Sequence, residues 1–172
     1  MKGTAARGLL SGDDEARRMA LLSSEKDRAE NVMIVDMVRN DLGRVAEVGS
    51  VETPALFSAE KYDTVWQLTS TVTARTRPGT SLASVFGALF PSASITGAPK
   101  VATMEIICDL EQHPRGVYCG TIGFGGPGPD GKPEWAFNVA IRTVLVDREQ
   151  GVAHYGTGGG VTIDSTADGE YR

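Results

Sequence analysis

The stretch Pro91–Leu110, which reads PSASITGAPKVATMEIICDL, organises this chain of 172 residues. It predicts a loop of small residues leading into an amphipathic helix capped by Thr96 and Gly97. Pro99 suits the first turn, because proline lacks the N–H that has no helical partner there. The loop is either an anion site at the helix N-terminus or a tight turn kept small for packing. The inward face of the helix is expected to comprise Val101, Met104, Ile107 and Cys108.

The composition limits the class of protein. Hydrophobic residues make up 41% of the chain, enough for one core of ordinary size. A formal net charge of -5 without a basic stripe argues against a nucleic-acid binder. Cys108 and Cys119 have no CxxC partner and indicate buried thiols in a reducing compartment. No apolar run approaches the ~18 residues of a membrane helix, so we expect a cytoplasmic protein without a membrane partner.

Before the central stretch, the apolar spacing predicts one helix from Asp13 to Asn40, ended by Gly43. Asp27 and Glu30 stand three residues apart on it and therefore share a face. Two acids on one turn can bind a hard cation, although solvated surface acids give the same pattern.

Strands are expected on both sides of the central stretch. Residues 44–51 and 64–74 read as strands, with Trp66 on the core face of the second. Thr80 is expected to cap a short helix that runs to Phe90. After the central helix, the sequence predicts a strand at 116–125, a hairpin loop at 127–133, an alternating strand at 135–146, a turn at 148–151, short strands at 152–155 and 161–164, and a helix from Ala167.

Two features of the C-terminal third suggest anion binding. Arg142 falls within the strand expected at 135–146, among small or apolar neighbours. A buried arginine requires a carboxylate, from either the protein or a ligand. The run Gly156–Gly160 exposes backbone N–H groups that can hold an anion, but it lacks the lysine and the spacing of a nucleotide-binding loop.

Six segments together resemble the chorismate-binding family, which includes anthranilate synthase component I and the isochorismate synthases. The resemblance covers nearly the whole chain, and Lys2-Gly3-Thr4 together with KDRAENVMIVDMVRND look most like its aminodeoxychorismate synthase component I branch. The segments are KGT at Lys2–Thr4, KDRAENVMIVDMVRNDLGRV at Lys26–Val45, SITGAPKVATMEII at Ser94–Ile107, RGVYCGTIGF at Arg115–Phe124, FNVAIRT at Phe137–Thr143 and GTGGGV at Gly156–Val161.

The resemblance implies an α+β fold like that of anthranilate synthase component I, with antiparallel sheets and outer helices. Residues 1–172 are then expected to be the C-terminal half of a single chorismate-binding domain, truncated at both ends. The family's N-terminal half is absent, and its main C-terminal magnesium ligand would fall one residue past Arg172. The resemblance places the site between the sheet and the loop at 94–100.

The resemblance also implies a role for individual residues. Lys2 matches a nucleophile that attacks chorismate at C2 and expels the C4 hydroxyl, so that ammonia can add at C4. Glu30 and Glu170 match ligands of Mg²⁺. The residues expected to contact the substrate are Thr96 in the loop, Tyr118 and Arg142 at a carboxylate, and Gly158 and Gly160 as backbone donors.

The activity implied is amination of chorismate at C4 to 4-amino-4-deoxychorismate, for para-aminobenzoate and folate. The ammonia would come from a glutamine amidotransferase subunit. Anthranilate synthase component I, or another chorismate-utilising enzyme, is the first alternative, although anthranilate synthases have a histidine where this chain has Gln67. The second alternative is an inactive fragment that acts only as a binding module.

Overall fold

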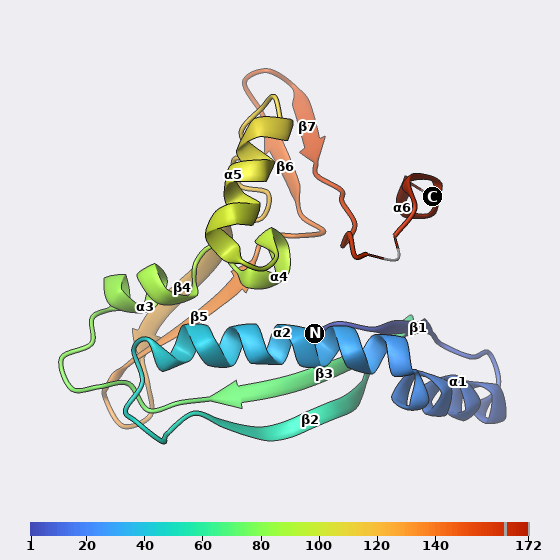
Figure 1. The fold of residues 1–172 in the computed structure, drawn as a ribbon, viewed down its shortest axis with the longest axis horizontal. Helices are drawn as coiled ribbons and strands as arrows, with labels where there is room; N and C mark the ends of the chain where they lie inside the picture. Colours follow the sequence, from blue (N-terminus) through green and yellow to red (C-terminus); the bar gives the residue numbers. More distant parts are fainter. Residues whose placement is uncertain (164, 172) are drawn as a thin grey trace. The chain divides into compact units, whose positions relative to one another are not determined.

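The computed structural model describes residues 1–163 and 165–171, which divide into the units Met1–Ser94 and Ile95–Arg172. Each unit is described by itself, and the elements can be followed in Figure 1. The first unit contains β1 (Thr4–Ala6), α1 (Ser11–Ser23), α2 (Glu25–Gly43), β2 (Glu52–Lys61), β3 (Val65–Thr73) and α3 (Leu82–Leu89). The short helix α4 (Ala93–Thr96) spans the boundary between the units.

The first unit is built on an antiparallel sheet with the order β1-β3-β2. Strand β3 is central and confirms the strand expected at 64–74. Its Trp66 face is buried as expected, but Gln67 and Thr69 on the other face are buried too. Their polar groups are satisfied by hydrogen bonds from Gln67 Nε2 to the Gly3 carbonyl and from Thr69 Oγ1 to Glu60 Oε1. A central strand is therefore covered on both faces, which its alternation did not reveal.

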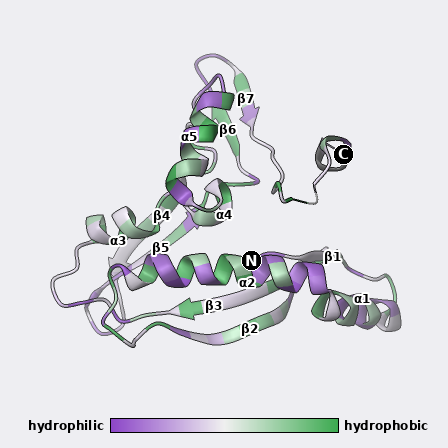
Figure 2. Cartoon of the chain, in the orientation of Figure 1, coloured by the Kyte–Doolittle hydropathy of each residue, from purple (hydrophilic) through white to green (hydrophobic). Residues whose placement is uncertain are grey.

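Two helices replace the single helix expected over residues 13–40. The backbone of Ser24 is extended, with ψ 111°, and its hydroxyl accepts a hydrogen bond from the Asp27 N–H. Ser24 therefore ends α1 and caps α2. Gly43 was expected to be the C-cap of this helix. It is instead the last helical residue of α2, and Arg44 is the C-cap. In Figure 2, hydrophilic and hydrophobic residues are interspersed along α2.

The prediction of a strand at 44–51 is wrong. Gly49 has φ +79°, and the Ser50 N–H donates to the Glu47 carbonyl, so this segment turns instead of extending. The strand begins only at Glu52, as β2. Helix α3 forms close to its expected position, but Ser81 caps it in place of Thr80, because the Ser81 hydroxyl accepts from the Ser84 N–H.

The core of the first unit lies between α1 and the sheet. Leu21, Trp66 and Leu68 form its buried cluster, and Leu68 is fully buried. Burial of a leucine side chain contributes about 1.5–3 kcal/mol. The cluster therefore fixes α1 on the sheet.

The second unit consists of hairpins and helices. It contains α5 (Lys100–Leu110), β4 (Thr121–Pro127), β5 (Pro133–Val139), β6 (Val144–Asp147), β7 (Val152–Tyr155) and α6 (Ala167–Tyr171). Pairing of β4 with β5 and of β6 with β7 confirms the hairpin loop and the turn expected at 127–133 and 148–151. The helix expected from Ala167 is also confirmed.

Four expectations for the second unit are wrong, in addition to the strand through Arg142 that is described with the candidate site. Pro99 occupies the N-cap position of α5 without a side-chain cap, while Thr96 and Gly97 lie before it. Val101, Met104 and Cys108 are exposed and Ile107 is only half-buried, since helical spacing identifies an apolar face but not what covers it. The segment 116–120 forms turns, so the strand starts at Thr121. Residues 161–163 form no strand, and Asp164 lies outside the described residues.

No single helix among the described residues is long and apolar enough to span a membrane. Among the same residues, the bent helix pair Leu82–Thr96 and Lys100–Leu110 reaches the length and apolar composition of a span when both helices are taken together. The cytoplasmic location stays a prediction.

A buried carboxylate joins α1 to the sheet. Asp14 accepts hydrogen bonds from Arg7 Nε at 2.6 Å, Arg7 Nη2 at 2.7 Å, the Gly8 N–H at 2.9 Å and Trp66 Nε1 at 2.9 Å. The Arg7 guanidinium also lies over the Trp66 ring, 5.2 Å from its centroid. Hydrogen bonds from Arg7, Gly8 and Trp66 hold the pKa of Asp14 well below its ordinary value.

We predict that Asp14→Asn lowers the thermal midpoint by several degrees at pH 7 and flattens its acid dependence. A carboxylate with a depressed pKa stabilises the fold above its ordinary pKa of about 4 and loses that effect as the pH falls below it. Thermal unfolding measured from about pH 6 to about pH 2 tests this. Asp13→Asn is the matched control, because the ion pair of Asp13 with Arg17 is exposed to water. Parallel acid curves for Asp14→Asn and the unmodified protein would contradict the prediction.

Candidate functional site

Lys2 lies just before β1 and is held by the central strand. Its N–H donates to the Leu68 carbonyl at 3.0 Å, and the Leu68 N–H donates to the Gly3 carbonyl at 2.9 Å. Gly3 has φ +101°, and a Cβ there would lie 3.1 Å from the Cβ atoms of Asp27 and Leu68. Glycine is therefore needed both for the backbone conformation and for close approach to α2.

The side chain of Lys2 meets Glu30 on α2. Lys2 Nζ lies 3.1 Å from Glu30 Oε2, and the side chains are 38% and 21% exposed. The structure thus brings together the residue expected to be the nucleophile and one of the two expected magnesium ligands, both in the first unit. The ion pair is partly shielded from water, which strengthens it relative to a fully exposed pair.

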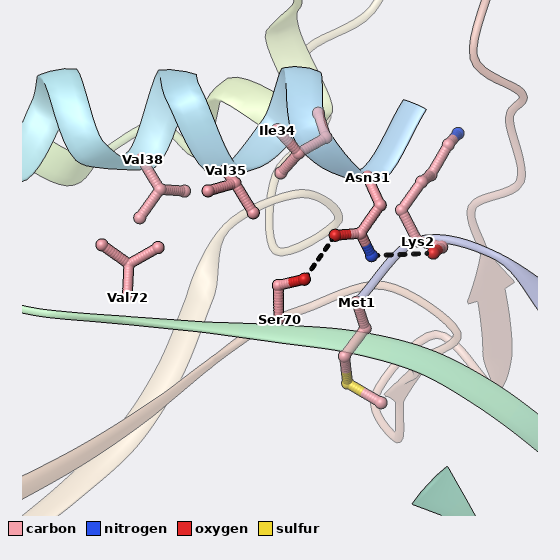
Figure 3. A pocket seen from close by; sticks show the side chains of 8 residues that line it. All are labelled: Met1, Lys2, Asn31, Ile34, Val35, Val38, Ser70 and Val72. Carbon is pink, nitrogen blue, oxygen red and sulfur yellow. Dashed lines mark hydrogen bonds between the residues drawn. The ribbon is translucent and has the colours of Figure 1, made fainter. Parts of the chain in front are cut away.

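The amide of Asn31 links α2, Lys2 and β3 (Figure 3). Asn31 Nδ2 donates to the Lys2 carbonyl at 3.0 Å and to the Leu68 carbonyl at 3.4 Å, while its Oδ1 accepts from Ser70 Oγ at 2.6 Å. Asn31 is 2% exposed. Sequence reasoning missed it, although it stands four residues before the buried Val35 and so shares the core face of α2. A polar residue on the core face of α2 was the signal in the sequence that could have identified Asn31.

A small cavity of about 90 Å³ lies beside Lys2, between α2 and β3 (Figure 3). One end is polar and the other apolar, but the volume is well below the roughly 300–1,000 Å³ of a pocket that encloses a small-molecule ligand. The cavity is lined by Met1, Lys2, Asn31, Ile34, Val35, Val38, Ser70 and Val72.

In the second unit, Tyr118 lies in a turn joined to the end of β5. The Cys119 N–H donates to the Ala140 carbonyl at 3.0 Å, and the Ala140 N–H donates to the Gly120 carbonyl at 2.9 Å. Burial, followed by the neighbouring Cys119, raises the pKa of Tyr118. Its hydroxyl is therefore a neutral hydrogen-bonding group at pH 7.

The ring of Tyr118 lies against the glycine run that was expected to bind an anion. A Cβ added to Gly156 would lie 2.6 Å from Tyr118 Cδ2, and one added to Gly158 would lie 3.1 Å from Tyr118 Oη. Tyr118 and Gly158, two of the expected substrate contacts, are thus neighbours. The bare backbone at Gly156 leaves room for the ring.

Arg142 is not within a strand, contrary to expectation. Strand β5 ends at Val139 and β6 begins at Val144, so the segment predicted as one strand is broken. Arg142 has φ +52° and is exposed. Because water solvates its guanidinium there, Arg142 does not require a buried carboxylate partner.

The remaining expected site residues are all in or at the edge of the second unit. Thr96 ends α4 and is half-buried, so it is placed in the loop region but does not cap α5. Gly158 and Gly160 are exposed. Glu170 lies on α6, and its side chain lies outside the described part of the structure.

The described residues offer an incomplete set of metal ligands. Glu30 provides a carboxylate, and hard oxygen ligands of this kind fit Mg²⁺, which commonly takes one or two carboxylates together with water and substrate oxygens. Among residues 1–163 and 165–171, no group of three or more His, Cys, Asp or Glu side chains is placed to hold a metal ion. Glu30 fits the ion as one ligand of several.

Comparison with known proteins identifies the family of the chain. The sequence profile of the chorismate binding enzyme family matches residues 1–172. The chain belongs to this family. The crystal structure of anthranilate synthase component I from Streptococcus pneumoniae is similar with a TM-score of 0.78 at 34% identity, over 99% of this chain and 38% of that chain. The expected α+β fold, with helices and antiparallel sheets like those of anthranilate synthase component I, is therefore confirmed.

Curated relatives favour one branch of the chorismate binding enzymes. Aminodeoxychorismate synthase from Streptomyces griseus is 48% identical over 172 residues, covering 100% of this chain and 23% of the relative. Aminodeoxychorismate synthase component 1 from Bacillus subtilis is 44% identical, covering 99% and 35%. Anthranilate synthase component 1 1 from Haloarcula marismortui is 43% identical, covering 99% and 34%. The chain thus spans between 23% and 35% of the length of these relatives.

We predict that Gly156→Ala displaces the Tyr118 ring and lowers the free energy of unfolding by about 1–3 kcal/mol, as overpacking does. Denaturant unfolding and the NMR signals of the Tyr118 ring measure the two effects. Gly126→Ala is the control, since a Cβ at Gly126 meets nothing within 4 Å. Equal effects of the two substitutions would show that Tyr118 is not held by this contact.

Proposed function

We propose that the protein aminates chorismate at C4 to give 4-amino-4-deoxychorismate. The observation that carries the proposal is the juxtaposition of Lys2 Nζ and Glu30 Oε2 at 3.1 Å, within segments that match the family. The first relatives named above, which bear the name aminodeoxychorismate synthase, support this choice of reaction. Ammonia is supplied by a glutamine amidotransferase partner, as the term component 1 in the name of a relative suggests.

In the proposed reaction Lys2 is a nucleophile. The Lys2 ammonium, which is paired with Glu30 in this structure, first gives up a proton. The amine then forms a bond to C2 of chorismate, the two ring double bonds shift toward C4, and the C4 hydroxyl departs with that proton as water. Ammonia then forms a bond to C4, the double bonds shift back, and the lysine amine leaves C2 with its electron pair. The net change replaces hydroxyl by amine, with water as the other product. A lysine whose main chain is fixed at both its N–H and its carbonyl suits this attack.

The substrate is a dicarboxylate, whereas the chain carries a net charge of -5. Local positive groups must therefore bind it. We assign one carboxylate to Arg142 and Tyr118, and the other to backbone N–H groups at Gly158 and Gly160, with Thr96 as a further contact. Glu30 and Glu170 would hold Mg²⁺, which would neutralise negative charge on the substrate.

Anthranilate synthesis is a second candidate. The relative from Haloarcula marismortui is 43% identical, nearly as similar as the one from Bacillus subtilis, and its name states that activity. Both reactions begin from chorismate and ammonia, so the family alone does not separate them. Gln67, where anthranilate synthases have histidine, favours the first candidate.

Lys2→Ala in the complete protein is expected to lower kcat for amination at least about a hundredfold, because it removes the nucleophile. The rate is measured with chorismate, Mg²⁺ and ammonium, which makes the assay independent of the amidotransferase. Lys26→Ala, an exposed lysine on α2, is the control and should leave kcat unchanged. Undiminished amination by Lys2→Ala would remove the covalent role.

The product of the same assay distinguishes the two candidates. We expect a product that gives para-aminobenzoate only after a lyase is added. Fluorescent anthranilate formed without a lyase would instead identify the second candidate. The absence of either product, in a protein that binds chorismate in calorimetry, would favour the binding-module alternative.

A further inference from the structure

The amide of Asn31 has its orientation fixed by neighbours that can only donate or only accept. The Phe57 N–H can only donate, and it donates to Ser70 Oγ at 3.1 Å. The carbonyls of Lys2 and Leu68 can only accept, so Nδ2 must face them. Oδ1 therefore faces Ser70, whose hydroxyl accepts from Phe57 with a lone pair and donates its proton to Oδ1 at 2.6 Å. Every polar atom of this buried network has a partner of the required kind.

The contact with the Lys2 carbonyl has no equivalent in ordinary strand pairing. Lys2 precedes β1, whose registered pairs with β3 begin at Thr4. Its N–H is bound by Leu68, whereas its carbonyl is bound by the Asn31 side chain. The Asn31 side chain thus donates to the Lys2 carbonyl the hydrogen bond that a neighbouring strand would otherwise donate. The neighbouring Glu30 contacts the other end of the same lysine, through Nζ.

We propose that Asn31 is a positioning residue that sets the main chain of Lys2, and with it the place from which the Lys2 amine attacks. This inference rests on the function proposed for Lys2. Consecutive residues of α2 hold the lysine at its carbonyl and at its amine, so the helix fixes where the side chain begins and where it ends. A misplacement of about 1 Å at a reacting group can cost about a hundredfold in rate, so loss of this hydrogen bond acts on kcat.

Two substitutions separate positioning from stability. Asn31→Asp keeps the size and the Oδ1 acceptor for Ser70 but replaces the donor to the Lys2 carbonyl by an oxygen. Ser70→Ala removes the hydroxyl that donates to Asn31 Oδ1 and leaves in place the Asn31 Nδ2 group that donates to the Lys2 carbonyl. Asn40→Asp makes the same change of charge at an exposed position on α2. Each variant is made in the complete protein and assayed with chorismate, Mg²⁺ and ammonium, alongside its thermal midpoint.

We expect Asn31→Asp to lower kcat at least about tenfold, with KM for chorismate within about threefold, because the loss falls on the reacting geometry. Ser70→Ala should lower the thermal midpoint about as much as Asn31→Asp does. It should change kcat no more than about threefold. Asn40→Asp should change neither. If Asn31→Asp does not fold, Asn31→Ser takes its place, since its shorter hydroxyl cannot span to the Lys2 carbonyl.

Three results would overturn the positioning role while leaving the proposed function intact, provided that Lys2→Ala is inactive. These are an Asn31 variant with normal kcat, a Ser70→Ala variant that loses kcat as much as Asn31→Asp, and failure of both Asn31 variants to fold. A Lys2→Ala variant that keeps its activity would overturn the proposed function itself, and this inference with it.

Discussion

The pairing of Leu68 with the backbone of Lys2 and Gly3 is the interaction on which the first unit depends. The side chain of Leu68 is fully buried in the core, while its N–H and carbonyl bind the segment that carries the lysine. One residue thus joins the hydrophobic core to the candidate site. A core that keeps β3 rigid also keeps Lys2 in place, because a hydrogen-bonded neighbour follows the strand to which it is bound.

The elements predicted well from the sequence are those whose side-chain period is uninterrupted. Strand β3 was found in this way, whereas the hairpin loop at 127–133 was predicted from its glycines and prolines. Strand β2 was missed because its register with β3 shifts twice, Pro54 lies within it and Phe57 has φ +57°. Bulges disrupt the alternation on which a strand prediction rests. The strand predicted through Arg142 was wrong for the opposite reason. The alternation of side chains continues through this segment, but the extended backbone is interrupted between Val139 and Val144.

The candidate site was predicted in part, and by resemblance more than by pattern. On composition alone Lys2 is an ordinary lysine, and Asp27 and Glu30 are ordinary surface acids. The family match gave Lys2 and Glu30 their roles, and the structure places them 3.1 Å apart. The hydrogen bonds from Asn31 to the Lys2 carbonyl and from Gln67 to the Gly3 carbonyl were not predicted. Contacts between a side chain and a distant backbone group leave no period in the sequence.

The shortness of β1 makes the spacing of this segment as important as its composition. Three residue pairs define its register, from Thr4 with Gln67 to Ala6 with Val65. A strand advances about 3.3 Å per residue and alternates its faces, so one residue inserted after Gly3 would shift the lysine along the sheet and reverse its side. The glycine conformation, the ion pair and the amide contact would all be lost together. Chain length between Lys2 and β1 is therefore a constraint that no substitution within the segment can relieve.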